Sequence, residues 1–405
     1  MTERLPLGGV RVLELGLWVA APAAGGILAD WGADVVKIEP LGGEPMRHVL
    51  KLTEGRAVHR TPLFDLDNRG KRSIELDLRH ERGRDLLQHL LTEIDVFVTN
   101  LRPGALDRLG LDAATVLERH PRLVYAAVSG YGLAGPDRDR AGYDVGAFWA
   151  RSGAAGMIVP PGEEPPSSPT AFGDHLTGVT IVAGIMGALF DRERTGRGQL
   201  VSTSLLRTGV YAVSADLALQ AYYGRRSETR RRDEVGNPLL NRYRAADGRW
   251  FFLIGIESDR HWPPLARAIG RSGLIDDDRF RDARSRRHHA GELVALLDEA
   301  FATRDRSKWA ARFDDEGVWW SPVNSAEDIL ADPQAVAAGA FVDVPDGDGT
   351  GYRSVATPVD FSSGRAGPQG PVPAAGAHTA AILSEIGVGS EELAKLRDEG
   401  VVGHE

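Results

Sequence analysis

Residues 10–39 read VRVLELGLWVAAPAAGGILADWGADVVKIE. Two runs rich in β-branched residues, 10–15 and 34–39, predict strands. The Ala- and Gly-rich stretch 21–31 between them predicts a helix that ends at Gly32. A strand, a helix and a second strand in this order are typical of a βαβ unit, in which the two strands lie parallel. The stretch therefore predicts an α/β domain with a mostly parallel sheet.

The same alternation continues along the first half of the chain. Further elements are expected as strands at 73–77, 95–99, 123–129 and 200–203 and as helices at 82–93 and 174–193. The first strand-to-helix turn lacks the G-x-G-x-x-G pattern that lets backbone amides approach a pyrophosphate. A nicotinamide enzyme is therefore disfavoured, although the alternation is Rossmann-like.

The pattern changes after residue 235. Residues 241–256 resemble an antiparallel hairpin with the turn Ala246-Asp247-Gly248, and helical stretches extend to about residue 316. We therefore expect a second, smaller α+β domain after the large Rossmann-like domain. The expected boundaries are 1–205 for the large domain, 206–235 for a linker, 236–325 for the small domain and 326–344 for a second linker.

The composition excludes several classes of function. The 405 residues contain no cysteine, which excludes disulfides and thiolate nucleophiles and is typical of the reducing cytoplasm. The net charge of -9 argues against a general affinity for nucleic acid. No signal peptide and no uninterrupted membrane-spanning segment is recognised, so we expect a cytoplasmic protein with no membrane partner. No P-loop, zinc-protease or serine-hydrolase motif occurs, and no metal site is expected.

Five short segments combine into a larger pattern. They are residues 9–15, 32–40, 68–77, 100–104 and 195–199. Taken in order, together with the Ile-Leu-Ser-Glu-Ile-Gly pattern of the tail, they resemble the family III CoA-transferases, also called the formyl-CoA transferase or CaiB/BaiF family. The resemblance covers essentially the whole chain. It implies a large Rossmann-like, CoA-binding domain built from both chain ends, in which residues 345–405 complete residues 1–205. It also implies that the small domain is inserted and that two interlocked subunits form a homodimer.

The resemblance also implies an activity: transfer of coenzyme A from an acyl-CoA donor to a carboxylic acid acceptor, in a ping-pong type of sequence. The matching nucleophile is Asp174 of the step Gly173-Asp174, which would form an acyl-aspartyl anhydride and then an aspartyl-CoA thioester. A carboxylate that opens a helix faces free N–H groups and the positive end of the dipole, so we expect it to stay ionised at neutral pH. The alternative is a plain helix N-cap. Coenzyme A is then a substrate, and no permanently bound cofactor is expected.

Coenzyme A carries several phosphate charges, which need cationic or N–H donors. Arg108 is the first choice for a phosphate contact, although Arg79 and Arg108 are otherwise ordinary surface charges, and Leu76 and Leu101 ordinary core residues. The positions that match the family's contacts to coenzyme A and the acyl group are Trp18, Val19, Ala20, Leu76, Arg79, Asn100, Leu101, Arg108, Leu109 and Tyr143. The residue after Tyr143, Asp144, matches an acid that supports the family's active site.

Some positions depart from the formyl-CoA transferases. Val19 replaces a glutamine, Pro40 an arginine and Ala141 a lysine, so specificity for oxalate or formate is not expected. His175 follows Asp174, but successive side chains on a helix point roughly 100° apart, which favours a packing role over proton transfer. Two other functions stay open. One is a 2-methylacyl-CoA racemase, which would have histidine in place of Tyr143, and the other is a thioesterase or a protein that only binds CoA esters.

Overall fold

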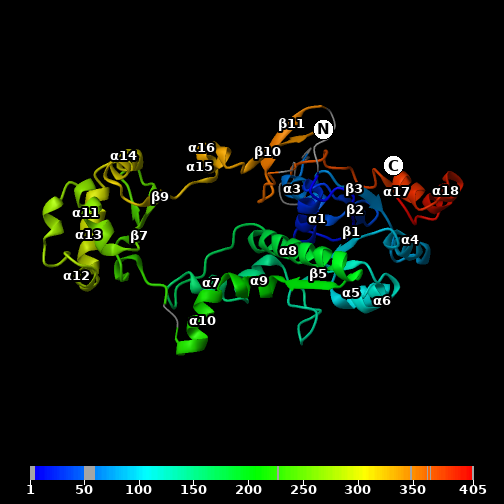
Figure 1. The fold of residues 1–405 in the computed structure, drawn as a ribbon, viewed down its shortest axis with the longest axis horizontal. Helices are drawn as coiled ribbons and strands as arrows, with labels where there is room; N and C mark the ends of the chain where they lie inside the picture. Colours follow the sequence, from blue (N-terminus) through cyan, green and yellow to red (C-terminus); the bar gives the residue numbers. More distant parts are fainter. Residues whose placement is uncertain are drawn as a thin grey trace. The chain divides into compact units, whose positions relative to one another are not determined.

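The computed structural model describes residues 5–49, 60–225, 228–346, 349–362, 364 and 366–403. The chain forms two compact units, whose elements are labelled in Figure 1. The large unit comprises the described residues within 1–156, 166–226 and 337–405, and the small unit those within 157–165 and 227–336. Residues 157–165, expected in the large domain, instead belong to the small unit, where the Thr229 hydroxyl donates to the Met157 carbonyl.

A six-stranded parallel sheet forms the centre of the large unit. Its strands are β1 (Arg11–Leu15), β2 (Asp34–Glu39), β3 (Arg72–Glu75), β4 (Val96–Thr99), β5 (Val124–Ser129) and β6 (Leu200–Ser204). They lie in the order β3-β2-β1-β4-β5-β6, and every neighbouring pair is parallel. This is the Rossmann strand order, so the predicted α/β class is confirmed.

Helices cover both faces of this sheet (Figure 1). One face carries α1 (Ala20–Asp30), α3 (Pro62–Asn68) and α8 (Phe172–Thr195). The other carries α4 (Glu81–Leu91), α5 (Pro103–Leu109), α6 (Ala113–Arg119), α17 (Thr379–Glu385) and α18 (Ser390–Asp398). Side chains alternate along each strand, so Val12 enters the core under α1 and α8, whereas Leu13 enters the opposite core. The C-terminal helices thus complete the large unit.

The small unit is built on a three-stranded antiparallel sheet of β7 (Leu240–Arg244), β8 (Trp250–Ile254) and β9 (Trp320–Pro322). The predicted hairpin is therefore present. The sheet packs on an aromatic core that includes Phe251, Phe301, Trp309 and Phe313. Its helices are α11 (Ser258–Ala268), α12 (Ala283–His288), α13 (Ala290–Phe301), α14 (Arg306–Glu316) and α15 (Ala326–Ala331).

The other described α-helices and strands are short. They are α7 (Ala154–Met157), α9 (Leu205–Ala212), α10 (Ser214–Tyr223), α16 (Pro333–Ala337) and the antiparallel pair β10 (Phe341–Pro345) and β11 (Gly351–Val355). The pair is tied to the large unit by Arg69, whose guanidinium donates to the carbonyl of Val355 at 2.9 Å and bonds Asp30 at 2.7 Å.

Among the described helices, only α8 is long and apolar enough to cross a membrane. An apolar core helix passes the same test of length and composition. α8 connects β5 to β6 and packs against α1, with Ile181, Val182 and Ile185 in the core. Part of α8 stays exposed in the single chain, including Phe172, Phe190 and neighbouring apolar side chains.

Candidate active site

A cavity of about 600 Å³ opens at the carboxyl ends of β1, β4 and β5. The chain leaves β1 toward β2 and leaves β4 toward β5, on opposite sides in the sheet order, so the two loops part and open a crevice. The cavity is lined by residues 17–20, 100–105, 128–130 and 138–143 together with Arg108, Asp174 and Leu205. It therefore lies at the position where doubly wound sheets bind ligands.

Asn100 joins the two loops that part at the cavity. Its Oδ1 accepts a hydrogen bond from the backbone N–H of Leu17 at 2.9 Å, and its Nδ2 donates to the carbonyl of Leu17 at 2.7 Å. The side-chain amide thus satisfies backbone groups that no neighbouring strand reaches. Asn100 lines the cavity, with its amide engaged within the protein.

α8 carries Asp174 into the wall of the cavity. The helix begins at Phe172, after Ala171, whose φ of 56° is in the left-handed region. Asp174 is therefore the third helical residue and not the N-cap, so the alternative of a plain N-cap is wrong. In the described part of the chain, no hydrogen bond to the Asp174 carboxyl group is found.

Burial works against the expected ionisation of Asp174 at neutral pH. Burial raises the pKa of Asp174 from 3.8 to about 7, the carboxylates of Asp144 and Asp67 also raise it, and His175 lowers it. The partial charge at the helix N-terminus does not compensate for the lost water. Burial therefore opposes the ionisation that the helix N-terminus favours.

Asp144 contributes more to this repulsion than Asp67 does. It lies in the π-helical turn Asp144–Ala150, is 6% exposed, and its Oδ1 accepts a hydrogen bond from the N–H of Gly173 at 3.0 Å. Its Oδ2 is buried and has no hydrogen-bond partner among the residues described. Burial raises the pKa of Asp144 as well. A Cβ atom on Gly173 would stand 2.4 Å from Asp144 Oδ1 and 2.1 Å from the Phe148 ring, so only glycine fits before Asp174.

His175 is turned away toward α3. Its Nδ1 lies 3.0 Å from the carbonyl of Ala171, and its Nε2 lies 3.2 Å from Oδ1 of Asp67. Burial lowers the pKa of His175, but the hydrogen bond and charge of Asp67 outweigh burial, and the net direction is upward. Both ring nitrogens are engaged within the protein, which agrees with the expected packing role.

Seven of the predicted substrate contacts line the cavity with Asp174: Trp18, Val19, Ala20, Asn100, Leu101, Arg108 and Tyr143. Three do not. Leu76 is 2% exposed and pairs with Val402, Leu109 packs against the core beneath α5, and Arg79 is on the surface, where it bonds Asp77 at 2.9 Å. The contacts of all ten residues with coenzyme A stay predictions.

The cavity also has arginines that the sequence analysis did not single out. Arg102, Arg138 and Arg140 line it beside Arg108. Arg138 bonds Asp107 at 2.7 Å, whereas neither Arg102 nor Arg108 has an ion-pair partner in the ranges that the structure describes. Unpaired guanidinium groups suit a ligand with phosphate groups. The signal for Arg102 was its place just after β4, at the edge of the sheet where ligands bind.

No cluster of three or more His, Cys, Asp or Glu side chains that could hold a metal ion occurs within the described residues. The site itself combines one poorly hydrated carboxyl group, a second carboxyl group that raises its pKa, and the arginines around a cavity. Gly130 and Gly142 also line the cavity. A Cβ on Gly142 would stand 3.0 Å from the Cα of Gly130, so backbone approaches backbone closely there.

Comparisons with known proteins identify relatives of the whole chain. The family model described as CoA-transferase family III matches residues 7–379. The chain is 32% identical over 398 residues to an (R)-2-hydroxy-4-methylpentanoate CoA-transferase of Clostridioides difficile, covering 98% of this chain and 99% of that protein. It is 32% identical over 396 residues to a cinnamoyl-CoA:phenyllactate CoA-transferase of Clostridium sporogenes, covering 96% of each. A CAIB/BAIF family protein from Brucella suis has a similar structure, with a TM-score of 0.84, 31% identity, and coverage of 95% of this chain and 100% of that one.

The raised pKa of Asp174 has a consequence for stability. Because its pKa in the folded state lies above 3.8, the stability that it contributes is complete below about pH 4 and is lost as the pH rises through about 7. We expect Asp174→Asn to raise the free energy of unfolding at pH 8 by about 2–4 kcal/mol. This gain at pH 8 should be larger than the gain at pH 5 by about 2 kcal/mol. Urea unfolding at the two pH values measures both gains.

The matched control for this measurement is Asp77→Asn. A hydrogen bond from Arg79 lowers the pKa of Asp77, so this variant should show no gain at pH 8. If Asp174→Asn gives the same gain at pH 5 and pH 8, Asp174 does not titrate in this range, and the burial argument fails.

Proposed function

The chain belongs to CoA-transferase family III, and we propose that it transfers coenzyme A between an acyl-CoA donor and a carboxylic acid acceptor through covalent intermediates on Asp174. The observation that carries the proposal is the position of Asp174: a partly buried carboxyl group without a hydrogen-bond partner in the described structure, in the wall of a cavity that also holds unpaired arginines. Coenzyme A is a substrate in this scheme.

In the first half-reaction, a carboxylate oxygen of Asp174 attacks the thioester carbonyl of the donor. The carbon–sulfur bond breaks, CoA thiolate leaves, and an acyl-aspartyl anhydride forms. The thiolate then attacks the side-chain carbonyl of Asp174, the anhydride bond breaks, and the donor acid leaves as a carboxylate. Asp174 is now a thioester of coenzyme A.

In the second half-reaction, the acceptor carboxylate attacks this aspartyl thioester. A new mixed anhydride forms and CoA thiolate is released again. The thiolate attacks the acceptor carbonyl of the anhydride, which yields the new acyl-CoA and returns Asp174 as a carboxylate. No water and no redox step is needed, and each tetrahedral intermediate is an oxyanion that backbone N–H groups can stabilise.

The electrostatics of the site favour acylation. Burial and the Asp144 charge make the ionised form of Asp174 costly, which is why its pKa is raised. In the anhydride and the thioester, Asp174 is neutral, so both penalties disappear. The covalent intermediates therefore lack the charge repulsion that the free carboxylate experiences. In addition, a poorly hydrated carboxylate is a better nucleophile.

The phosphates of coenzyme A are assigned to Arg102 and Arg108, whose guanidinium groups have no partner among the described residues. Trp18 and Tyr143 contribute an aromatic wall, with ring centroids 5.8 Å apart in an edge-to-face arrangement. Tyr143 is 61% exposed in the single chain, so one side of its ring is available to a ligand.

Racemase and thioesterase activities have less support. A racemase needs two groups that remove and return the α-proton, and Tyr143 stands in the cavity where the racemases would have histidine. His175 does not replace it, because both of its ring nitrogens are engaged within the protein. The relatives compared above carry the names of CoA-transferases.

We also propose that two copies of the chain form a homodimer. Exposed apolar side chains gather on α8, α9 and α10, which contact one another in sequence. They are Phe172, Leu176, Val179, Phe190, Val210, Tyr211, Leu219, Tyr222 and Tyr223. α10 buries none of its residues in the single chain. An exposed apolar surface of this kind is typical of a protein–protein interface, and a second copy is the partner that the family resemblance implies. The interlocked arrangement rests on that resemblance alone.

The activity is tested by mixing the protein with an acyl-CoA and an acceptor acid. We expect a new acyl-CoA, and we expect Asp174→Asn to lower its rate of formation by about 10³-fold or more, because an amide cannot form the anhydride. Liquid chromatography with mass spectrometry separates the outcomes. Release of free coenzyme A would support a thioesterase, and deuterium exchange at the α-carbon without a new acyl-CoA would support a racemase.

The dimer is tested by sedimentation velocity at micromolar concentration. We expect a mass twice that of the chain, and we expect Tyr222→Asp to increase the monomer fraction, because it places a charge on the exposed face of α10. Arg119→Asp on α6, outside that face, is the control. A monomer for the unaltered protein at the concentrations of the activity assay would contradict the proposal.

A further inference from the structure

Trp18 has a backbone conformation that side chains rarely adopt. Its φ is 66°, and Ala171 is the only other described non-glycine residue with a positive φ. Trp18 also lines the cavity, and its ring meets that of Tyr143 edge to face. A tryptophan in the left-handed region relaxes unless its surroundings hold it there. The loop after β1 therefore needs a specific support.

Glu44 supplies that support through its carboxylate. Its Oε2 accepts a hydrogen bond from the backbone N–H of Trp18 at 2.8 Å, and its Oε1 lies 3.0 Å from Nζ of Lys37. Nζ of Lys37 in turn donates to the carbonyl of Gly16 at 3.1 Å. One ion pair thus holds the backbone on both sides of Leu17.

Lys37 and Glu44 belong to a larger buried network. Glu14 bonds Nζ of Lys37 at 2.7 Å with one oxygen and Nζ of Lys71 at 2.6 Å with the other. All four side chains, those of Glu14, Lys37, Glu44 and Lys71, are fully buried. The charges of the two carboxylates and the two ammonium groups cancel, and buried charges need such partners of opposite sign. A Cβ on Gly25 of α1 would stand 1.9 Å from Oε2 of Glu14, so the helix has glycine above the network.

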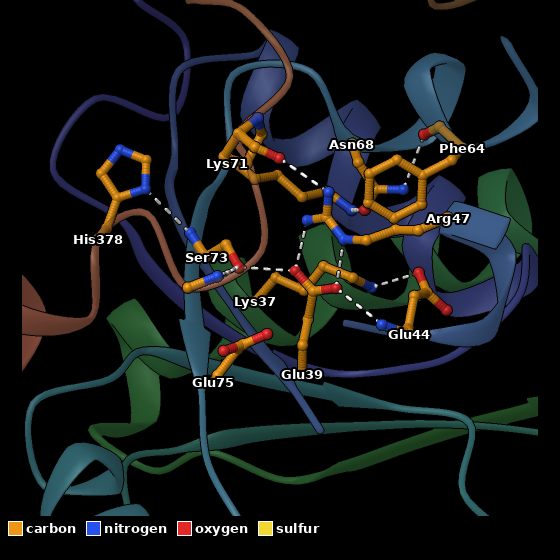
Figure 2. A network of polar contacts seen from close by, with 12 residues as sticks. Lys37, Glu39, Glu44, Arg47, Phe64, Asn68, Lys71, Ser73, Glu75 and His378 are labelled. Carbon is orange, nitrogen blue, oxygen red and sulfur yellow. Dashed lines mark hydrogen bonds and ion pairs between the residues drawn. The ribbon is translucent and has the colours of Figure 1, made fainter. Parts of the chain in front are cut away.

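Glu44 is itself held in place, as Figure 2 shows. Its backbone N–H donates to Oε2 of Glu39 at 3.0 Å, and Glu39 binds the guanidinium of Arg47 with both oxygens, at 2.7 and 2.6 Å. The hydroxyl of Ser73 donates to Glu39 at 2.6 Å. The turn that carries Glu44 is therefore fixed to β2 and β3, and the carboxylate meets the Trp18 loop in one orientation.

We propose that Glu44 is a positioning residue for coenzyme A that acts through Trp18: it holds the β1–α1 loop in its left-handed conformation and so preforms the Trp18–Tyr143 wall of the cavity. This role rests on the proposed function, because it takes the cavity as the site of coenzyme A. Glu44 needs no contact with the ligand. Because the loop is already ordered, binding of the ligand does not lose free energy on ordering it.

The test uses Glu44→Gln in the full-length protein, with coenzyme A as the probe in isothermal titration calorimetry. Glutamine has one carbonyl oxygen, so it cannot serve both Trp18 N–H and Lys37. We expect the Kd for coenzyme A to rise roughly tenfold or more, as losing a hydrogen bond to a charged group does. In turnover, KM for the acyl-CoA rises in the same proportion, and kcat changes less than about threefold.

The matched control is Asp30→Asn. Asp30 forms a buried ion pair with Arg69 at 2.7 Å, and neither residue lines the cavity. This variant lowers Tm without raising the Kd for coenzyme A. If Glu44→Gln lowers Tm as Asp30→Asn does and leaves Kd unchanged, Glu44 only stabilises the fold and the proposal is overturned.

A second pair of variants isolates the backbone effect. Trp18→Gly removes the indole, and glycine adopts a positive φ without support. In the Trp18→Gly background, Glu44→Gln should change the Kd for coenzyme A less than twofold. Residue 18 then adopts a positive φ without Glu44, and no indole remains to be positioned. An equal effect of Glu44→Gln in both backgrounds would overturn the proposal.

A measurement on the unaltered protein covers the case in which Glu44→Gln does not fold. The N–H of Trp18 should exchange slowly with deuterium before coenzyme A is added, because Glu44 already holds it. Fast exchange that becomes slow only with coenzyme A would contradict a preformed loop. Absence of any binding of coenzyme A to the unaltered protein would instead contradict the proposed function.

Discussion

The carboxyl group of Asp174 loses much of its hydration when the chain folds and gains a second carboxyl group, Asp144, as a neighbour. The rest of the site depends on this arrangement. Ala171 turns the chain into α8 through a left-handed residue, and Gly173 leaves room for Asp144 and the Phe148 ring. Keeping this carboxyl group poorly hydrated costs stability, a compromise that is common at active sites.

The parallel sheet explains why the cavity is where it is. Loops after β1 and β4 leave in opposite directions, and Asn100 joins them through the backbone of Leu17. The same split exposes Arg102 and Arg108 at the cavity. The arginines and the Asp174 carboxyl group are thus brought to one cavity by a single topological feature, without a glycine-rich first strand-to-helix turn.

Much of the large unit could be predicted, because parallel strands buried on both faces give continuous apolar runs. The predicted strand ends differ from the observed ones by at most two residues. Helices α3, α5 and α6 were missed, since seven residues make about two turns and carry little periodicity. The network of Glu14, Lys37 and Lys71 was also invisible, because its partners lie 23 and 57 residues apart and depend on the strand order. The rise in the pKa of Asp174 was not foreseen, because its helix position was weighed without burial.

The central claim, covalent catalysis on Asp174, is tested most directly by trapping the intermediate. The protein is incubated with an acyl-CoA, treated with hydroxylamine, digested and analysed by mass spectrometry. An anhydride or thioester on Asp174 would be converted to the hydroxamate, so the account predicts that modification on this residue and on no other carboxylate. An unmodified Asp174 peptide, in a sample that forms product at its normal rate, would contradict the account.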